Sequence, residues 1–305
     1  MVRPTIGLAL GGGAARGWSH IGVLRTLIAA GLEPDIVAGT SIGAVAGGCY
    51  VTGKLDGLQE FATTLTRRRL FGFLDFNFGG SGLLTGQKLS ARLETHLNGI
   101  AIEDMERPFV AVATELGTGH EIWLKKGDLV TALKASFALP GIFRPMQING
   151  RWLIDGALVN PIPVSVCRAL GARIVIAVNL NNDLFGKGSV IHDQEALAEP
   201  PLPATETEPP QGNGRAAVHL LHRQIFGGKG APGMSAVMID AINITQDRIA
   251  RSRLAGDPPD ITVNPKVGGI GLFDFHRAKE AIAAGAKATE AQLEEIRIAV
   301  RALAA

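Results

Sequence analysis

Near its start the chain has two short apolar runs that lead directly into glycines, at residues 5–10 and 35–40. A helical pattern of apolar residues follows each run, the first closing at Gly31 and the second reaching Tyr50. Two parallel strands must be joined by a crossover, which is usually a helix. Strand, helix, strand and helix in this order therefore predict a parallel sheet covered by helices. We expect a three-layer α/β/α fold with a mostly parallel central sheet.

Further strands and helices are expected along the rest of the chain. Residues 109–114 (FVAVAT) and 172–179 (ARIVIAVN) have the continuous apolar character of buried strands, and residues 121–125 are expected to pair with the first of them. The other expected strands are 152–154 and 260–264, and the other expected helices are 129–138, 164–170, 234–254 and 276–303.

The sequence changes character between residues 183 and 233. Proline, glycine, glutamate and threonine are frequent there, and three prolines lie in residues 199–203. A segment of this composition buries too little apolar surface to form a core of its own. We therefore expect one domain with its core at residues 5–182 and 234–305. The flexible Pro-rich insertion at 183–233 is expected to hold one short helical piece at 218–226.

Composition excludes several classes of protein. The formal net charge of +2 over 305 residues argues against a nucleic-acid partner, and the arginine run at 67–69 is expected to be a solvated helix end. Cys49 and Cys167 stand in apolar surroundings, which indicates reduced core residues of a cytosolic protein. The sequence has neither an apolar stretch of about 18 residues nor a signal-peptide pattern. We expect a cytoplasmic protein without a membrane span.

The first candidate site is the glycine-rich run GGGAARG at residues 11–17, directly after the first strand. Adjacent glycines let several backbone N–H groups point at one spot, and a following helix N-terminus adds positive potential, so the run can cradle an anion. It lacks the spacing and the following acidic residue of a dinucleotide site, and it lacks the Gly-Lys-Ser/Thr of a P-loop. A simple turn is the alternative. The residues concerned are Gly11, Gly12, Gly13, Ala14 and Arg16.

The second candidate is Ser41 in the sequence GTSIG, between the second strand and its helix. A serine at a sharp strand-to-helix turn is exposed at the carboxyl edge of the sheet, and Gly39 and Gly43 give the turn room. This context favours a nucleophile over a structural turn. If the first two strands are neighbours, the N–H groups of residues 11–14 face an oxyanion that forms on Ser41, and we expect those of residues 12–14 to hold it.

A serine nucleophile needs a base, and the third candidate supplies one. Asp155 ends a short apolar strand and is followed by Gly-Ala. Apolar neighbours desolvate a carboxylate and raise its pKa, as a general base requires, whereas an aspartate in a turn is the alternative. The seven histidines fall in helices, surface segments or the insertion, so none of them is expected to be the base: His20, His96, His120, His192, His219, His222 and His276.

These three motifs, in this order, resemble the patatin-like phospholipase family. The likeness runs from about residue 5 to residue 182 and includes ASFALPGIFRP at 135–145 and NPIP at 160–163. Residues 271–285 are similar to the end of the short bacterial members. Several ordered motifs together are far more specific than a lone GxSxG.

The resemblance implies a role for each candidate residue. Ser41 is the nucleophile, Asp155 is the base, and the glycine run supplies the oxyanion hole. Arg16 matches the family's basic residue beside that hole. Ala14 departs from the family, which has a glycine at this position, and a positive φ there would distort the hole.

By this resemblance the chain is expected to hydrolyse esters of acyl lipids, as a phospholipase A or lysophospholipase does, through a Ser–Asp dyad without a metal or other cofactor. The expected partner is an acyl lipid, with peripheral contact at the inner membrane surface. Two alternatives stay open: a regulatory or adaptor protein that retains the fold, and a hydrolase of small soluble esters or thioesters. The phenylalanine-rich residues 70–78 are expected to line an acyl channel or touch a bilayer, with a loop that covers the core as the alternative.

Overall fold

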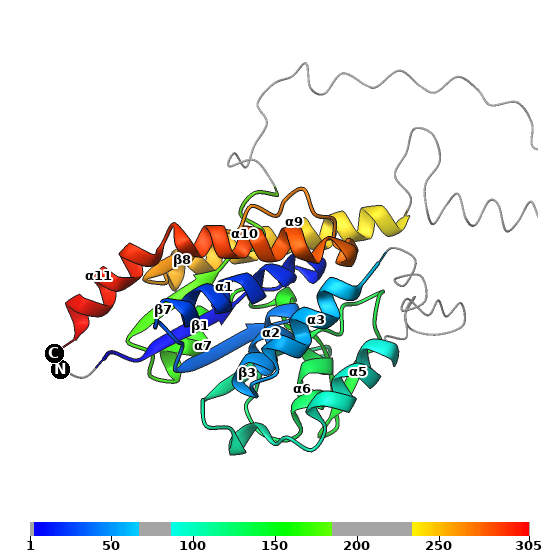
Figure 1. Cartoon of the computed structure of the whole chain (residues 1–305). Helices are drawn as coiled ribbons and strands as arrows, with labels where there is room; N and C mark the ends of the chain where they lie inside the picture. Colours follow the sequence, from blue (N-terminus) through cyan, green and yellow to red (C-terminus); the bar gives the residue numbers. More distant parts are fainter. Residues whose placement is uncertain (1–2, 67–86, 185–233, 305) are drawn as a thin grey trace, which may run out of the picture. The chain divides into compact units, whose positions relative to one another are not determined.

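A computed structural model of the chain describes residues 3–66, 87–184 and 234–304 (Figure 1). The chain divides into two compact units, one formed by Met1–Leu184 with Gln246–Ala305 and the other by Phe185–Thr245. In the second unit the described residues are the beginning of helix α9 (Met234–Gly256). The first unit holds the sheet and every site residue expected from the sequence.

Several sequence expectations lie outside the described residues. They are the arginine run at 67–69, the phenylalanine-rich segment at 70–78, the helical piece at 218–226 and nearly all of the insertion expected at 183–233. The expected division into one core and one insertion therefore stays a prediction.

Five parallel strands form the centre of the sheet. They are β1 (Ile6–Leu10), β2 (Ile36–Thr40), β3 (Phe109–Glu115), β7 (Ile174–Val178) and β8 (Ile261–Val263). Their order is β3-β2-β1-β7-β8, and each is parallel to its neighbours. Every residue of β1, β2 and β7 is buried, as is typical of parallel strands that are covered on both faces. The predicted central sheet is confirmed.

Three antiparallel strands extend the sheet from β3: β4 (Glu121–Leu124), β5 (Met146–Ile148) and β6 (Arg151–Asp155). Residues 111–114 of β3 pair with β4, residues 109–112 pair with β2, and residues 113–115 pair with β6. Since β4 overlaps both of the others, β2 and β6 must lie end to end along the opposite edge of β3. Their carboxyl ends therefore meet.

Helices cover both faces of the sheet (Figure 1). Along β3, Ala111 and Ala113 belong to the larger core while Val110 and Val112 belong to the smaller one, because successive strand residues point to opposite faces. The larger core includes side chains of α1 (Ser19–Ala29), α2 (Ile42–Val51), α3 (Leu55–Thr64), α5 (Gln87–Leu97), α6 (Leu129–Ser136), α10 (Ala278–Glu290) and α11 (Leu293–Leu303). The smaller core includes side chains of α7 (Val164–Ala169) and Ala250 of α9. The predicted three layers are confirmed.

Helices α1 and α10 approach each other through glycines. A Cβ atom at Gly22 of α1 would lie 2.0 Å from the Ile282 carbonyl oxygen. One at Gly285 of α10 would lie 2.0 Å from the Ser19 carbonyl oxygen. Both positions require glycine, because real side chains never come so close to a backbone oxygen.

The prediction of one carboxyl-terminal helix at 276–303 is wrong in one respect, because the structure has two helices there. Helix α10 ends at Glu290 and α11 begins at Leu293. Gln292 stands between them with φ −103° and ψ −5°. The break lets Ile296 of α11 reach the core, where it is fully buried.

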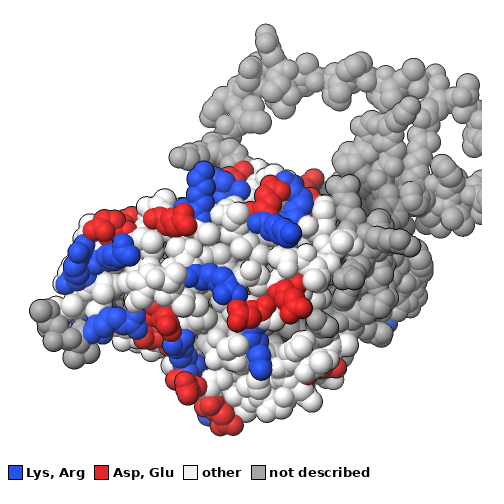
Figure 2. All heavy atoms as spheres, viewed as in Figure 1, with Lys and Arg blue, Asp and Glu red and all other residues white. Residues whose placement is uncertain are grey.

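The distribution of surface charge and the state of the two cysteines agree with what the composition indicates. Lysine and arginine are interspersed with aspartate and glutamate over the described part of one face (Figure 2). Cys49 and Cys167 are buried and unpaired, and burial raises the pKa of each thiol to about 12. Among the described helices none has the length and apolar character that crossing a membrane requires.

Candidate active site

Ser41 and Asp155 are in direct contact. The Ser41 hydroxyl donates a hydrogen bond to Asp155 Oδ2 over 2.6 Å. The other carboxylate oxygen, Oδ1, accepts the N–H of Ala157 at 2.8 Å. The carboxylate is thus held at both oxygens, and one of them is at the distance that proton transfer from a nucleophile requires.

The sheet register brings the two residues together. Thr40, the last residue of β2, lies opposite Val112, and Asp155, the last residue of β6, lies opposite Ala113, the next position along the same edge of β3. Thr114 Oγ1 donates to the Asp155 carbonyl at 2.9 Å and fixes the end of β6. A dyad formed by residues far apart in sequence is therefore a consequence of two strands that end at one point.

Ser41 stands at a strained turn. Its φ of 56° and ψ of −125° are unusual for a residue other than glycine, and it is partly exposed between the buried residues Thr40 and Ile42. A Cβ atom at Gly39 would lie 2.5 Å from the Ala44 backbone nitrogen, and one at Gly43 would lie 2.2 Å from the Leu10 carbonyl oxygen. Both glycines make room for the turn, and its role as a nucleophile elbow stays a prediction.

Burial raises the pKa of Asp155 from 3.8 to about 6, while the hydrogen bonds from Ser41 and Ala157 oppose the increase. The residue is 2% exposed, so desolvation of the charged form is the main cause. A carboxylate with this pKa is ionised at neutral pH and still accepts a proton readily, which suits a general base. The increase agrees with the effect expected from the apolar neighbours.

The glycine run lies beside the dyad, but only part of it is available as an oxyanion hole. A Cβ atom at Gly12 would lie 3.5 Å from the Ser41 Cβ and 3.2 Å from the Ala157 Cβ. However, the N–H of Gly11 donates to the Val178 carbonyl at 3.2 Å, and that of Gly12 donates to the Pro161 carbonyl at 3.0 Å. These bonds anchor the loop, so Gly12, expected as a donor to the oxyanion, is already engaged.

With the Gly12 N–H engaged, those of Gly13 and Ala14 are left as candidate donors to an oxyanion. In the described part of the chain, the N–H of neither residue is bonded to a backbone carbonyl. Ala14 has a φ of 48°, so the position where the family has glycine does require a positive φ. This is the φ that was expected to distort the hole. An alanine adopts it at a cost of about 1 kcal/mol and keeps its N–H, so the part that Ala14 plays in an oxyanion hole stays a prediction.

Arg16, within the glycine run, is bonded to a distant part of the chain. Arg16 is buried, and its Nε donates to the Ile270 carbonyl at 2.8 Å. Burial lowers the pKa of Arg16, and the nearby charge of Asp183 opposes that decrease. Its expected place beside the oxyanion hole stays a prediction.

His20 is fully buried, and its Nε2 lies 2.8 Å from the Gly11 carbonyl oxygen. Burial lowers the pKa of His20 to about 4, so the ring is neutral at neutral pH. A neutral ring whose Nε2 carries the proton donates to that carbonyl and helps hold the glycine run. Of the histidines that the structure describes, none hydrogen-bonds to Ser41 or Asp155.

Ser136 is a site residue that the sequence patterns did not identify. Its hydroxyl is fully buried on α6, accepts the N–H of Ser41 at 2.9 Å and donates to the Val112 carbonyl at 2.6 Å. It therefore ties the strained elbow to β3. The stretch at 135–145 that resembles the family contains this serine, and its burial next to the elbow was the missing signal.

Asn160 is the second residue that was missed. Its carbonyl oxygen accepts the hydroxyl of Thr40, the residue before Ser41, at 2.8 Å. It lies in the NPIP stretch that follows Asp155, which carried a family likeness but no role.

Across the described ranges, no three His, Cys, Asp or Glu side chains are grouped as ligands of a metal ion.

Comparison with known proteins places these motifs in a family. The sequence profile of the patatin-like phospholipases matches residues 8–168. A Mycobacterium tuberculosis protein described as an uncharacterised NTE family protein is 32% identical over 94% of this chain and 91% of its own. The human patatin-like phospholipase domain-containing protein 6 is 34% identical over 58% of this chain, which spans 13% of that protein.

One solved structure is similar to this chain. The crystal structure of VipD from Legionella pneumophila is similar with a TM-score of 0.44 and 13% sequence identity, covering 96% of this chain and 67% of that one. The profile match and the 32% identity to the mycobacterial protein over 94% of this chain are sufficient by themselves to assign the family. This chain belongs to the patatin-like phospholipase family.

Proposed function

We propose that the protein is a serine hydrolase of acyl-lipid esters that works through the Ser41–Asp155 dyad. The observation that carries the proposal is the 2.6 Å hydrogen bond from Ser41 Oγ to a buried carboxylate whose pKa is raised to about 6. This contact pairs a nucleophile with a base, as covalent acyl transfer requires. Membership of a family of phospholipases supports a lipid ester as the substrate.

The proposed reaction has two halves. Asp155 takes the proton of the Ser41 hydroxyl while the Oγ atom attacks the ester carbonyl carbon, whose oxygen becomes an oxyanion. Collapse breaks the bond to the leaving alkoxide, which receives the proton from Asp155, and an acyl ester remains on Ser41. Asp155 then takes a proton from water, the resulting hydroxide attacks the acyl carbon, and the fatty acid leaves as Ser41 regains its proton.

The N–H groups of Gly13 and Ala14 are the proposed oxyanion donors. They follow Gly12 in the same loop, and a Cβ atom at Gly12 would lie 3.5 Å from the Ser41 Cβ. Each well-aimed donor of this kind contributes about 3–4 kcal/mol to stabilising the transition state. Gly11 and Gly12 contribute by holding the loop in place through their bonds to Val178 and Pro161.

The proposed substrate class is a phospholipid or lysophospholipid, approached through peripheral contact with a membrane surface. The test is turnover of a series of acyl esters from short to long chains by the purified protein. We expect turnover to rise with chain length, and Ser41→Ala to lower it by about a thousand-fold or more. Thr95→Ala, which removes an exposed hydroxyl on α5, is the matched control and should leave turnover unchanged.

Three outcomes contradict the proposal or part of it. Undiminished turnover by Ser41→Ala would exclude Ser41 as the nucleophile. A preference for the shortest esters would favour a hydrolase of small soluble esters over a lipid hydrolase. No turnover of any ester, together with no reaction with a fluorophosphonate, would favour the regulatory protein that retains the fold.

A further inference from the structure

The segment at residues 159–161, just after the proposed base, contacts all three parts of the active site. The Asn160 carbonyl accepts the hydroxyl of Thr40, which precedes the nucleophile. The Pro161 carbonyl accepts the N–H of Gly12 in the oxyanion loop. The N–H of Asn160 donates to the Gly156 carbonyl at 2.9 Å, next to Asp155. A shift of this segment would therefore displace the elbow, the loop and the base together.

Helix α9 holds this segment through Arg253. The Arg253 Nε donates to the Val159 carbonyl at 3.0 Å, and its Nη2 donates to Glu121 Oε2 at 2.6 Å. The other oxygen of Glu121 accepts the Asn160 side-chain amide at 2.7 Å. One arginine and one carboxylate thus fix two successive residues of the segment, one through its backbone and the other through its side chain.

The surroundings make this pair more than a surface ion pair. The Glu121 side chain is 16% exposed, that of Arg253 is 34% exposed, and Asn160 is 1% exposed. The indole N–H of Trp123 also donates to Glu121 Oε1 at 2.6 Å, so the carboxylate has three donors. A planar guanidinium can serve a carboxylate and a carbonyl at once, which the single ammonium of a lysine cannot do with the same geometry.

We propose that Arg253 and Glu121 are positioning residues, which act through residues 159–161 on the nucleophile elbow and the oxyanion loop. Neither residue touches the dyad, so their effect on catalysis depends on the alignment of Ser41 and the loop. The proposal rests on the hydrolase function proposed above. Misplacement of a reacting group by about 1 Å can lower a rate about a hundred-fold, so a partly displaced elbow should have a large effect.

The first test compares ester turnover by Arg253→Gln, Arg253→Ala, Arg253→Lys and Glu121→Gln. We expect kcat to fall about ten-fold in Arg253→Gln, Arg253→Ala and Glu121→Gln with KM changed by less than about two-fold, because substrate binding is not the target. Arg253→Lys should lie between these variants and the wild type. Millimolar guanidinium should restore part of the kcat of Arg253→Ala, since the vacated position fits that cation.

Arg168 offers a matched control. Its side chain is 37% exposed, its Nη2 donates to Asp260 at 2.6 Å, and its Nη1 donates to the Arg173 carbonyl at 3.2 Å. It therefore has the same kinds of partner as Arg253 but contacts no part of the site. Arg168→Gln should leave kcat unchanged, and a kcat loss equal to that of Arg253→Gln would overturn the proposal.

The second test does not depend on activity. Hydrogen–deuterium exchange of the Gly12 amide, which is bonded to Pro161, should become faster by about ten-fold in Arg253→Gln and should not change in Arg168→Gln. Unchanged exchange in Arg253→Gln would overturn the positioning role. A wild type that hydrolyses no ester would contradict the proposed function, whereas this exchange measurement would still decide whether Arg253 holds the loop.

Discussion

The backbone of Ser41 shows how the surroundings can hold a residue in a conformation that residues with a side chain disfavour. A left-handed φ in a residue with a side chain costs of order 1–3 kcal/mol and persists only when the surroundings impose it. Here Gly39 and Gly43 allow the close approach of the turn to its neighbours, and the Ser136 hydroxyl holds the Ser41 N–H. The strain is the condition for lifting the hydroxyl out of the sheet toward Asp155.

Ser136→Ala tests this support. The change leaves the Ser41 N–H and the Val112 carbonyl without the buried hydroxyl, so we expect the free energy of unfolding to fall by about 1–3 kcal/mol. The rate of fluorophosphonate reaction with Ser41 should fall as well. Thr289→Val is the control, because it removes another buried hydroxyl, bonded to Gly285 in α10. It should lower stability without slowing that reaction, and equal slowing in both variants would refute the role of Ser136.

Asp155 should destabilise the fold when it is ionised. Its pKa is raised in the folded state, so between about pH 4 and pH 6 the folded protein retains a proton that the unfolded chain has released. The free energy of unfolding therefore falls as pH rises through this window. Asp155→Asn should be more stable than the wild type by about 1–3 kcal/mol near pH 7.5 and show no gain near pH 3.5, as measured by urea denaturation. A gain of the same size at both pH values would contradict this origin.

At the residue scale, the sequence patterns identified the residues of the motifs. They did not identify the residues that hold those motifs in place. Ser41, Asp155 and the glycine run stand in short patterns with a chemical meaning. Ser136 and Arg253 have no such pattern, because their importance depends on which backbone groups the fold places beside them. The same limit explains Gly12, whose N–H is engaged by a carbonyl that belongs to a distant part of the chain.

At the element scale, the contact between α1 and α10 depends on two glycines. Gly285→Ala would force a Cβ atom against the Ser19 carbonyl oxygen, so we expect a loss of about 2 kcal/mol or more in the free energy of unfolding. Gly57→Ala on α3 is the matched control, because a Cβ atom there meets nothing within 4 Å. That change should stabilise the protein by about 0.5–1 kcal/mol, since alanine is the better helix former. A stable Gly285→Ala variant would contradict the close packing.

Elements with a strong pattern were predictable, and elements whose limits depend on packing were not. The continuous apolar runs of β1, β2, β3 and β7 and the helical pattern of α9 were identified from the sequence. The three-residue strand β5 has too few residues for a period to show. The helical pattern continues without interruption across the division between α10 and α11, so the sequence does not show that division. The two helices are separated by the way in which each packs on the core.

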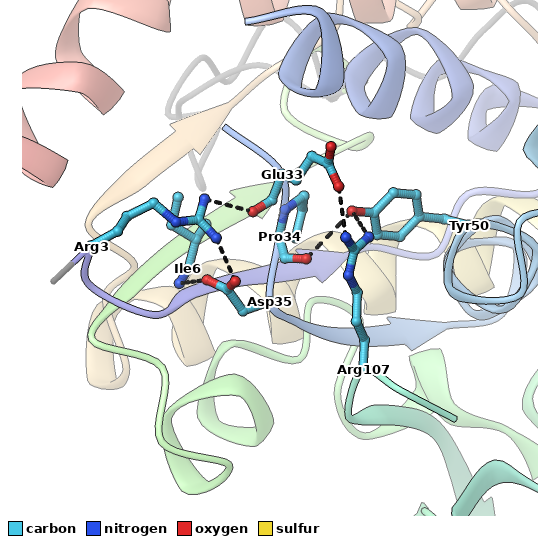
Figure 3. A network of polar contacts seen from close by, with 7 residues as sticks. All are labelled: Arg3, Ile6, Glu33, Pro34, Asp35, Tyr50 and Arg107. Carbon is cyan, nitrogen blue, oxygen red and sulfur yellow. Dashed lines mark hydrogen bonds and ion pairs between the residues drawn. The ribbon is translucent and has the colours of Figure 1, made fainter. Parts of the chain in front are cut away.

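At the scale of the whole sheet, a network of polar contacts joins the amino ends of the strands. The candidate active site lies at their carboxyl ends. Asp35, before β2, accepts the Ile6 N–H of β1 at 2.8 Å and is paired with Arg3 (Figure 3). Arg107, before β3, donates to the Tyr50 hydroxyl at 2.5 Å and to Glu33 at 2.6 Å. This network joins three strands and α2 at the edge opposite Ser41, so it can change stability without changing the dyad.

Tyr50 gives this network a signature at alkaline pH. Burial raises the pKa of Tyr50 from 10.0 to about 12, and the charge of Arg107 opposes the increase. Between these pH values the folded protein keeps a proton that the unfolded chain releases, so the free energy of unfolding falls as pH rises. The stability advantage of wild type over Tyr50→Phe should shrink by about 1–2 kcal/mol between pH 9 and pH 11.5. An advantage that does not change over this range would contradict the raised pKa.

The site and the pH dependence of covalent labelling test the pairing of Ser41 with Asp155 most directly. The purified protein would be treated with a fluorophosphonate across pH 4–9, and the modified residue would be identified by peptide mass spectrometry. We predict a single adduct on Ser41, a rate that is half-maximal near pH 6, and a rate lower by about a hundred-fold or more in Asp155→Asn. Labelling of a different residue would contradict the dyad. So would labelling of Asp155→Asn at the rate of the wild type.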